Sequence, residues 1–99
     1  MARFDVYRSA DGADLLLDCQ SDLLSGLTTR FVVPLRLTDD APPPARRLNP
    51  VFEIDGRDHV MLTQFAAAVL VRDCGPVVAS LAREDAAIIN ALDMLISGY

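Results

Sequence analysis

Carboxylates are the main side chains in this sequence that are able to support acid–base chemistry. The chain has 14 acidic residues against 9 basic ones. Most candidates for a carboxylate pair stand beside turn-forming residues, where aspartate is common for conformational reasons. No spacing sets two of them in position to act as general acid and base. We therefore predict no catalytic dyad among Asp18, Asp22, Glu53, Asp55, Asp58 and Asp73.

One histidine and two cysteines are the candidates for nucleophilic or metal chemistry. His59 lies in a predicted hairpin arm, and no serine has the setting of an activated nucleophile, so we expect a strand surface residue. Cys19 and Cys74 lie far apart without companion histidines, whereas a structural zinc site takes about four ligands. Cys74 precedes a Gly-Pro pair in a predicted loop, where the sequence supplies no activating cation. The residues alone predict a binding module without metal or cofactor.

The composition indicates a folded domain that has a partner. The chain has 99 residues, 52% of them hydrophobic, and we expect one domain over residues 1–99. So small a body does not easily bury that much apolar surface, which favours a symmetric homodimer. The net charge of −5 disfavours direct binding to nucleic acid. No apolar stretch approaches the ~20 residues of a membrane span, so we expect a cytoplasmic protein with reduced thiols.

Alternating and β-branched apolar residues predict several antiparallel strands. Residues 4–6 and 15–17 form one expected hairpin around a turn at 9–12. Residues 51–54 and 59–63 form a second one around Asp55-Gly56. Residues 31–35 and 66–71 are further strand candidates, the latter closed by residues 73–76. Residues 38–47 contain three consecutive prolines and are expected to form a polar loop.

The last quarter of the chain changes to a helical period. Apolar residues recur at helical spacing on the face that we expect to be buried: Leu81, Ile88, Leu92 and Leu95, widened by Ile89 and Ile96. Asn90, Asp93 and Ser97 fall on the opposite side as a free polar stripe, and Gly98 suits the left-handed position after the helix. The predicted fold is mainly β, a curled sheet or small partly open β-barrel closed by a C-terminal helix.

Five blocks stand out along the chain: Phe4–Tyr7 (FDVY), Asp18–Leu24 (DCQSDLL), Arg30–Leu35 (RFVVPL), Leu48–Val51 (LNPV) and Asn90–Tyr99 (NALDMLISGY). Together, and in this order, they resemble the CcdB toxin family. The resemblance implies an SH3-like barrel with a C-terminal helix, assembled as a two-fold dimer. It also implies a toxin that binds the A subunits of DNA gyrase and traps the enzyme with cleaved DNA. The disordered tail of a CcdA-like antitoxin would neutralise it.

The same resemblance implies a set of gyrase-binding positions in two places. Carried over position by position, they are Leu23, Leu24, Asp93, Ile96, Ser97, Gly98 and Tyr99. The sequence departs from the family at three of them. Ser97 stands where well-known members have a tryptophan, Asp93 where they have an amide, and Tyr99 where they have an aliphatic terminus. Losing an aromatic–arginine contact at position 97 would weaken binding to gyrase by about 1–3 kcal/mol, or ten- to a hundredfold in affinity.

Two alternative functions remain open at this stage. The first is a non-toxic homologue that still binds antitoxin, which the serine at position 97 makes realistic. The second is an mRNA interferase on the same barrel, as in toxins of the MazF type. Such a nuclease needs a basic groove, for which Arg30, Arg46 and Arg47 are available, but the acidic balance of the chain argues against it.

Overall fold

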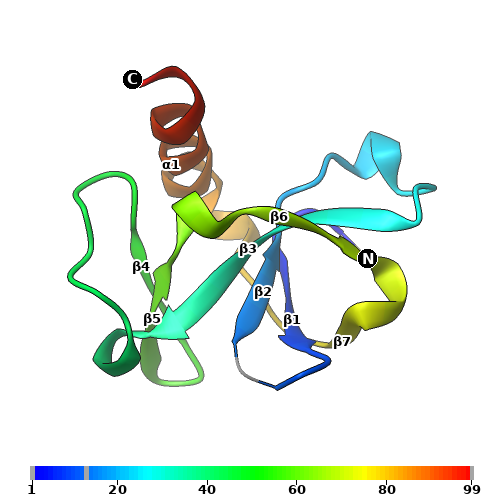
Figure 1. The fold of residues 1–99 in the computed structure, drawn as a ribbon, viewed down its shortest axis with the longest axis horizontal. Helices are drawn as coiled ribbons and strands as arrows, with labels where there is room; N and C mark the ends of the chain where they lie inside the picture. The colour runs from blue at the N-terminus through cyan, green and yellow to red at the C-terminus, as the bar shows by residue number, and fades with distance from the viewer. Residues whose placement is uncertain (1, 13, 99) are drawn as a thin grey trace.

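Strand β3 (Thr29–Leu37), nine residues long, is the strand on which the sheet is built. In the computed structural model, which describes residues 2–12 and 14–98, three strands pair with it. β2 (Leu15–Asp18) lies along one edge of β3. The other edge is shared by β6 (Ala67–Leu70), which pairs with residues 29–32, and β5 (Arg57–Met61), which pairs with residues 35–37. The long strand β3 therefore pairs with β6 along its first half and with β5 at its end (Figure 1).

The remaining strands extend this sheet in the order β4-β5-β3-β2-β1-β7, and every pairing is antiparallel. They are β1 (Asp5–Ser9), β4 (Val51–Ile54) and β7 (Cys74–Ser80). Over the described residues β4 and β7 stand at the two ends of this order, so the sheet is a half-barrel. The helix α1 (Asp85–Ser97) follows. This confirms the predicted class, a mainly β fold with a partly open barrel and a C-terminal helix.

Short 3₁₀ turns connect these elements. They are η1 (Asp22–Leu24), η2 (Thr38–Asp40), η3 (Thr63–Phe65), η4 (Val71–Asp73) and η5 (Ala82–Glu84). Both expected hairpins are present as β1–β2 and β4–β5. In the second hairpin Asp55 and Gly56 have φ of 53° and 77°, the left-handed pair that a tight two-residue turn requires.

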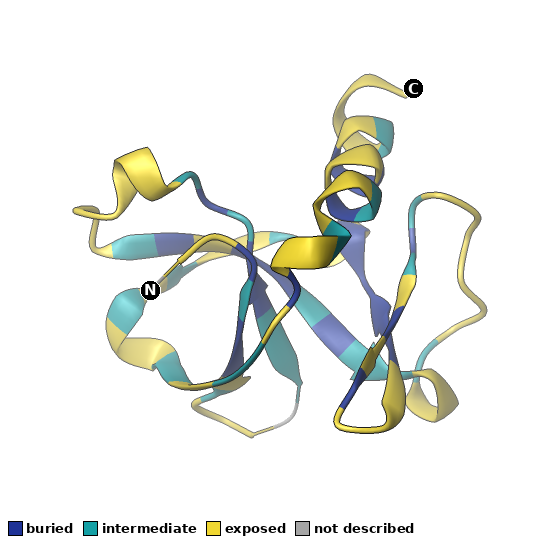
Figure 2. Ribbon diagram, turned by 180° about the vertical axis from the view of Figure 1, so that it is seen from behind, coloured by how far each residue is buried: buried dark blue, intermediate teal, exposed yellow. Residues whose placement is uncertain are grey.

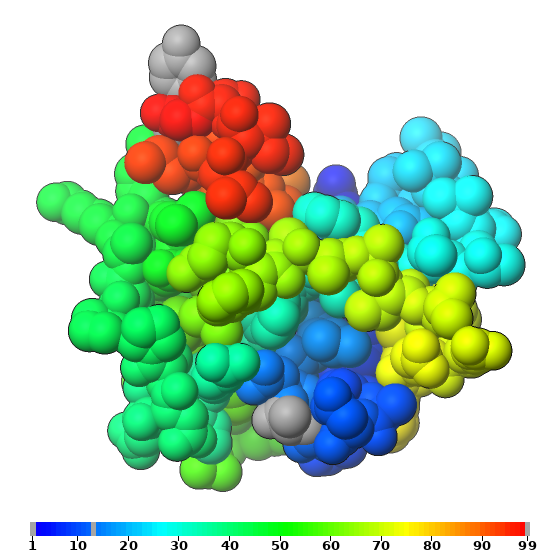
Figure 3. Space-filling model, in the orientation of Figure 1, coloured from blue at the N-terminus to red at the C-terminus, as the bar shows by residue number. Residues whose placement is uncertain are grey.

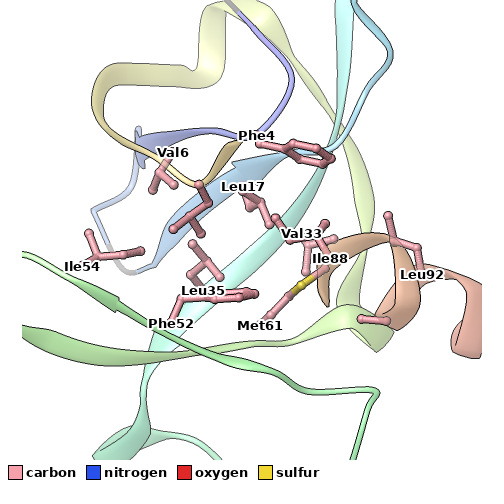
Figure 4. Packing of buried hydrophobic residues seen from close by; sticks show 12 residues of the cluster. Phe4, Val6, Leu17, Val33, Leu35, Phe52, Ile54, Met61, Ile88 and Leu92 are labelled. Carbon is pink, nitrogen blue, oxygen red and sulfur yellow. The ribbon is translucent and has the colours of Figure 1, made fainter. Parts of the chain in front are cut away.

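The core lies between the sheet and α1. Alternate residues of β2 and β3, including Leu17, Val33 and Leu35, point to the same side, as the two-residue period of a strand dictates. Figure 4 shows these side chains facing Met61 of β5 and Ile88 of α1. The helix is thus held by apolar contacts along its first turns.

Strand β7 corrects the sequence-based prediction, which placed a loop at residues 73–76. The chain from Cys74 to Ser80 pairs with β1. Gly75 allows this because a Cβ there would lie 2.4 Å from the backbone oxygen of Arg8. Pro76 is tolerated because β7 ends the strand order, and an edge strand has no second partner for its missing N–H.

The helix and the histidine bring two further corrections. Ile89, Leu95 and Ile96, expected on the buried face, are exposed. Figure 2 shows the C-terminal end of α1, which carries Leu95 and Ile96, projecting beyond the sheet, whereas Ile89 lies nearer the start of the helix on a face that the sheet does not cover. His59, expected on the surface, is only 8% exposed and stands opposite Phe52 in the β4–β5 pairing.

Candidate functional site

Two projections at one end of the molecule carry its most exposed large apolar side chains. Leu23 of η1 is 94% exposed and Ile96 of α1 is 77% exposed. Figures 1 and 2, related by a half turn about the vertical, both place η1 and the C-terminal end of α1 at the same end of the fold. In Figure 3 a hollow separates the two. The described residues of the predicted site therefore lie at one end of the fold, on two separate projections.

The projection that carries Leu23 and Leu24 is a single 3₁₀ turn with no buried residue of its own. Its first turn is capped by Ser21, whose Oγ accepts the Leu23 N–H at 3.2 Å. Asp22 Oδ1 accepts the N–H of Arg3 at 2.8 Å, which ties the turn to the start of the chain. Hydrogen bonds, rather than apolar packing, therefore hold this turn.

A buried charged cluster lies beneath that turn. Asp18 and Arg30 are fully buried, and Asp18 Oδ2 accepts Arg30 Nε at 2.8 Å and lies 2.6 Å from Arg30 Nη2. The Tyr7 hydroxyl donates to the same oxygen at 3.0 Å. Burial, followed by the contact with this carboxylate, raises the pKa of Tyr7 well above its usual range. The backbone N–H of Gln20 donates to Asp18 Oδ1 at 3.0 Å.

Sequence reasoning missed this cluster. It assigned Asp18 to turn chemistry and offered Arg30 as a phosphate-binding residue. The structure shows instead that Arg30 is enclosed and neutralised, so it is not accessible to a phosphate, while Arg46 and Arg47 are exposed in the loop before β4. The one sequence signal was the presence of charged residues inside otherwise apolar strand segments.

The other projection is the C-terminal half of α1. Asp93, Ile96, Ser97 and Gly98 are all exposed, and the polar stripe of Asn90, Asp93 and Ser97 is free as predicted. Gly98 has a φ of 78° and donates its N–H to the Met94 oxygen at 3.1 Å, which confirms it as the left-handed residue after the helix. The predicted site residue Tyr99 lies outside the described residues.

The thiols and the histidine are not arranged for catalysis. Burial raises the pKa of Cys19 from its ordinary value of 9.0 to about 12, and it raises the pKa of Cys74 as well. Both thiols are therefore protonated at neutral pH and weakly nucleophilic. His59 Nδ1 lies 3.0 Å from the backbone oxygen of Arg57. Within residues 2–12 and 14–98, no three histidine, cysteine or acidic residues are grouped so as to hold a metal ion.

The chain matches a known protein family over nearly its whole length. A family model described as CcdB protein matches residues 3–98, nearly the whole chain. The chain belongs to the CcdB family. It is therefore a toxin of a toxin–antitoxin system, of a family whose general target is gyrase. A search of curated proteins gave no match. In the part of this CcdB-family chain that the structure describes, no helix has the length and apolar character needed to cross a membrane.

Proposed function

We propose that this CcdB-family toxin binds the A subunit of DNA gyrase through η1 and the end of α1, and traps the enzyme with its DNA cleaved. The observation that carries the proposal is the exposure of Leu23 and Ile96 on two projections at one end of the fold. Burying one such side chain against a partner contributes about 1.5–3 kcal/mol. A fold that keeps several of them in water fits a protein-binding role.

Trapping requires differential binding rather than catalysis. A ligand that binds one conformation of its target more tightly shifts the target into that conformation. No reactive group is needed on the toxin, which fits the raised pKa of Cys19 and Cys74. Neutralisation would follow when the tail of a CcdA-like antitoxin folds onto the toxin and competes with gyrase.

We further propose that the toxin acts as a homodimer formed through the face of η3, β6 and α1. Phe65 on η3 is 54% exposed and Leu70 at the end of β6 is 37% exposed. Figure 3 shows β6 crossing this face directly beneath α1. Phe65→Asp is expected to give a monomer in sedimentation equilibrium, while Val51→Asp on edge strand β4 is expected to remain a dimer. A dimeric Phe65→Asp protein would exclude this face.

The gyrase proposal is tested with supercoiled DNA, ATP and gyrase from the toxin's own host. Linear DNA released by protease and detergent is the expected product. It should be lost when residues 97–99 are deleted and reduced by Leu23→Ala. Val51→Ala is the matched control, because Val51 is exposed but lies in β4, outside the proposed site. Absence of linear DNA with folded wild-type toxin would refute the proposal.

Ser97 supports a second candidate, a non-toxic homologue that still binds antitoxin. The exposed serine supplies no aromatic ring for stacking on an arginine of gyrase. In that case wild-type protein would bind antitoxin, yield no linear DNA and leave growth unaffected. Ser97→Trp should then restore poisoning, with a gain in gyrase affinity of about ten- to a hundredfold. If Ser97→Trp is also harmless, position 97 is not the reason for inactivity.

A further inference from the structure

The position of Leu23 raises the question of what holds an almost fully exposed leucine in place. The turn η1 contributes no buried side chain, so apolar packing does not fix it. A three-residue 3₁₀ turn also has too few internal hydrogen bonds to be stable alone. Besides the Ser21 cap and the bond of Asp22 to Arg3 at its start, η1 therefore needs contacts that fix its last residue.

Gln20 supplies these contacts. It is 7% exposed and lies directly before the Ser21 cap. Its side-chain Oε1 accepts the N–H of Phe31 in β3 at 2.9 Å, and its Nε2 donates to the Leu24 oxygen at 3.0 Å. One amide group thus connects the last residue of η1 to the central strand. Because one end accepts from an N–H and the other donates to a carbonyl, an ionised carboxylate, which can only accept, does not satisfy both.

The backbone of Gln20 is fixed in turn by the buried cluster. Its N–H donates to Asp18 Oδ1, and the other oxygen of Asp18 is held by Arg30 and Tyr7. A continuous chain of hydrogen bonds therefore runs from the fully buried ion pair to the exposed turn. Each of these hydrogen bonds restrains the backbone at Gln20 and thereby the direction of its side chain.

We propose that Gln20 is the positioning residue for the Leu23–Leu24 surface. It holds η1 in its bound shape before the partner arrives, so that binding does not have to order the turn. The inference rests on the proposed function for its effect on gyrase, but its effect on the turn itself is measurable without gyrase. Gln20 makes no contact with the partner and acts only through the two leucines.

The first experiment measures the turn in the free protein by amide hydrogen exchange. Gln20→Met keeps the length of the side chain and removes both hydrogen bonds. Exchange at Phe31 and at Ser25 should become at least tenfold faster, while exchange at Val33 in the core stays unchanged. Gln64→Met is the matched control, because the exposed Gln64 lies in η3 and accepts its hydrogen bond from Asn49, outside η1. Unchanged exchange at Phe31 and Ser25 would overturn the inference, whether or not the protein binds gyrase.

The second experiment is a thermodynamic cycle on binding to the gyrase A subunit. Gln20→Met is expected to weaken binding about tenfold in the wild-type background. In a Leu23→Ala/Leu24→Ala background the same substitution should have no further effect, because the residues it positions are gone. An equal loss in both backgrounds would show that Gln20 does not act through the leucines. If wild-type toxin fails to bind gyrase, the proposed function fails, and the exchange measurement still decides the role of Gln20.

A pH profile separates positioning from general stability. In Gln20→Glu the ionised carboxylate accepts from Phe31 but repels the Leu24 oxygen. Asp18 and Asp22, close to it in the chain, favour its protonation, whereas Arg30, paired with Asp18, and Arg3, whose backbone bonds Asp22, oppose it. The protonated acid has both a donor and an acceptor, so slow exchange at Ser25 should return as the pH is lowered. Fast exchange at every pH at which the variant is folded would contradict the role of the donated hydrogen bond.

Discussion

The buried pair of Asp18 and Arg30 leads to the sharpest prediction about stability. Asp18→Asn preserves the size of the side chain but removes its charge. Both partners are fully buried, and the Arg30 guanidinium lies within 2.8 Å of the Asp18 carboxylate. The substitution therefore leaves an uncompensated cation inside the protein. Water cannot reach this cation without opening the sheet.

The expected loss is large relative to the whole stability of the fold. Breaking a buried ion pair by removing one partner costs about 3–5 kcal/mol, whereas a domain of this size is stable by about 5–15 kcal/mol in total. The midpoint of thermal unfolding should therefore fall by roughly 12–40 °C. The matched control is Asp14→Asn, which breaks the partly exposed pair of Asp14 with Arg36 at 3.0 Å. That pair should contribute no more than about 1 kcal/mol.

Urea unfolding followed by far-ultraviolet circular dichroism measures both variants. Tryptophan fluorescence is not an option, because the chain has no tryptophan. The protein concentration must be held constant, since association stabilises the folded state. A double variant, Asp18→Asn with Arg30→Met, removes the stranded cation and should be more stable than Asp18→Asn alone. If Asp18→Asn and Asp14→Asn lose the same free energy, the reasoning about the buried charge is wrong.

Three further predictions concern stability and thiol reactivity at individual positions. Gly75→Ala should destabilise the fold by several kcal/mol, because the added Cβ would meet the Arg8 oxygen at 2.4 Å, whereas Gly26→Ala, with open space around it, should be neutral in urea unfolding. Cys19, whose pKa is raised to about 12, should react with a disulfide reagent more slowly than an exposed cysteine, because little of it is thiolate at neutral pH. Stability should fall as the pH rises above about 10, because unfolded tyrosine ionises there while buried Tyr7 stays neutral. Tyr7→Phe should reduce this alkaline loss, as measured by chemical denaturation across that range.

Local patterns were sufficient to predict most of the elements. The Asp55-Gly56 pair predicts a turn because it supplies two left-handed residues, and the alternating residues around it form the two arms. The helical period near the C-terminus likewise predicts α1 and its end at Gly98. These features depend on residues close together in the sequence. Reasoning from sequence is strongest for such features.

The failures concern properties that depend on distant parts of the chain. Gly75 and Pro76 resemble a turn when read locally. They nevertheless belong to the edge strand β7, because β1 lies beside this segment and pairs with it. The period of α1 shows which side chains share a face, but not how far the sheet reaches beneath it, so Ile96 was placed wrongly. The contact of Asp18 with Arg30 joins the neighbouring strands β2 and β3 across twelve residues of sequence, so no local pattern predicts that the two will pair.

The candidate site likewise has features that the sequence predicted and features that it did not. Leu23, Leu24 and the residues near Ser97 were identified by family resemblance, and their exposure fits a binding role. Their placement on two separate projections depends on the curvature of the sheet, which the sequence does not reveal. The role of Gln20 was equally hidden, because its two side-chain bonds connect a turn with a strand eleven residues away.

The exposure of the site has an evolutionary consequence. Leu23 and Ile96 contribute almost nothing to the core, so their replacement leaves the folded population nearly unchanged. Mutations at these positions are therefore filtered by selection for toxicity alone and not by selection for folding. A lineage can lose or redirect its poison in one or two steps while the antitoxin still meets an intact protein. Under such conditions harmless descendants should accumulate wherever the pressure to keep the poison is relaxed.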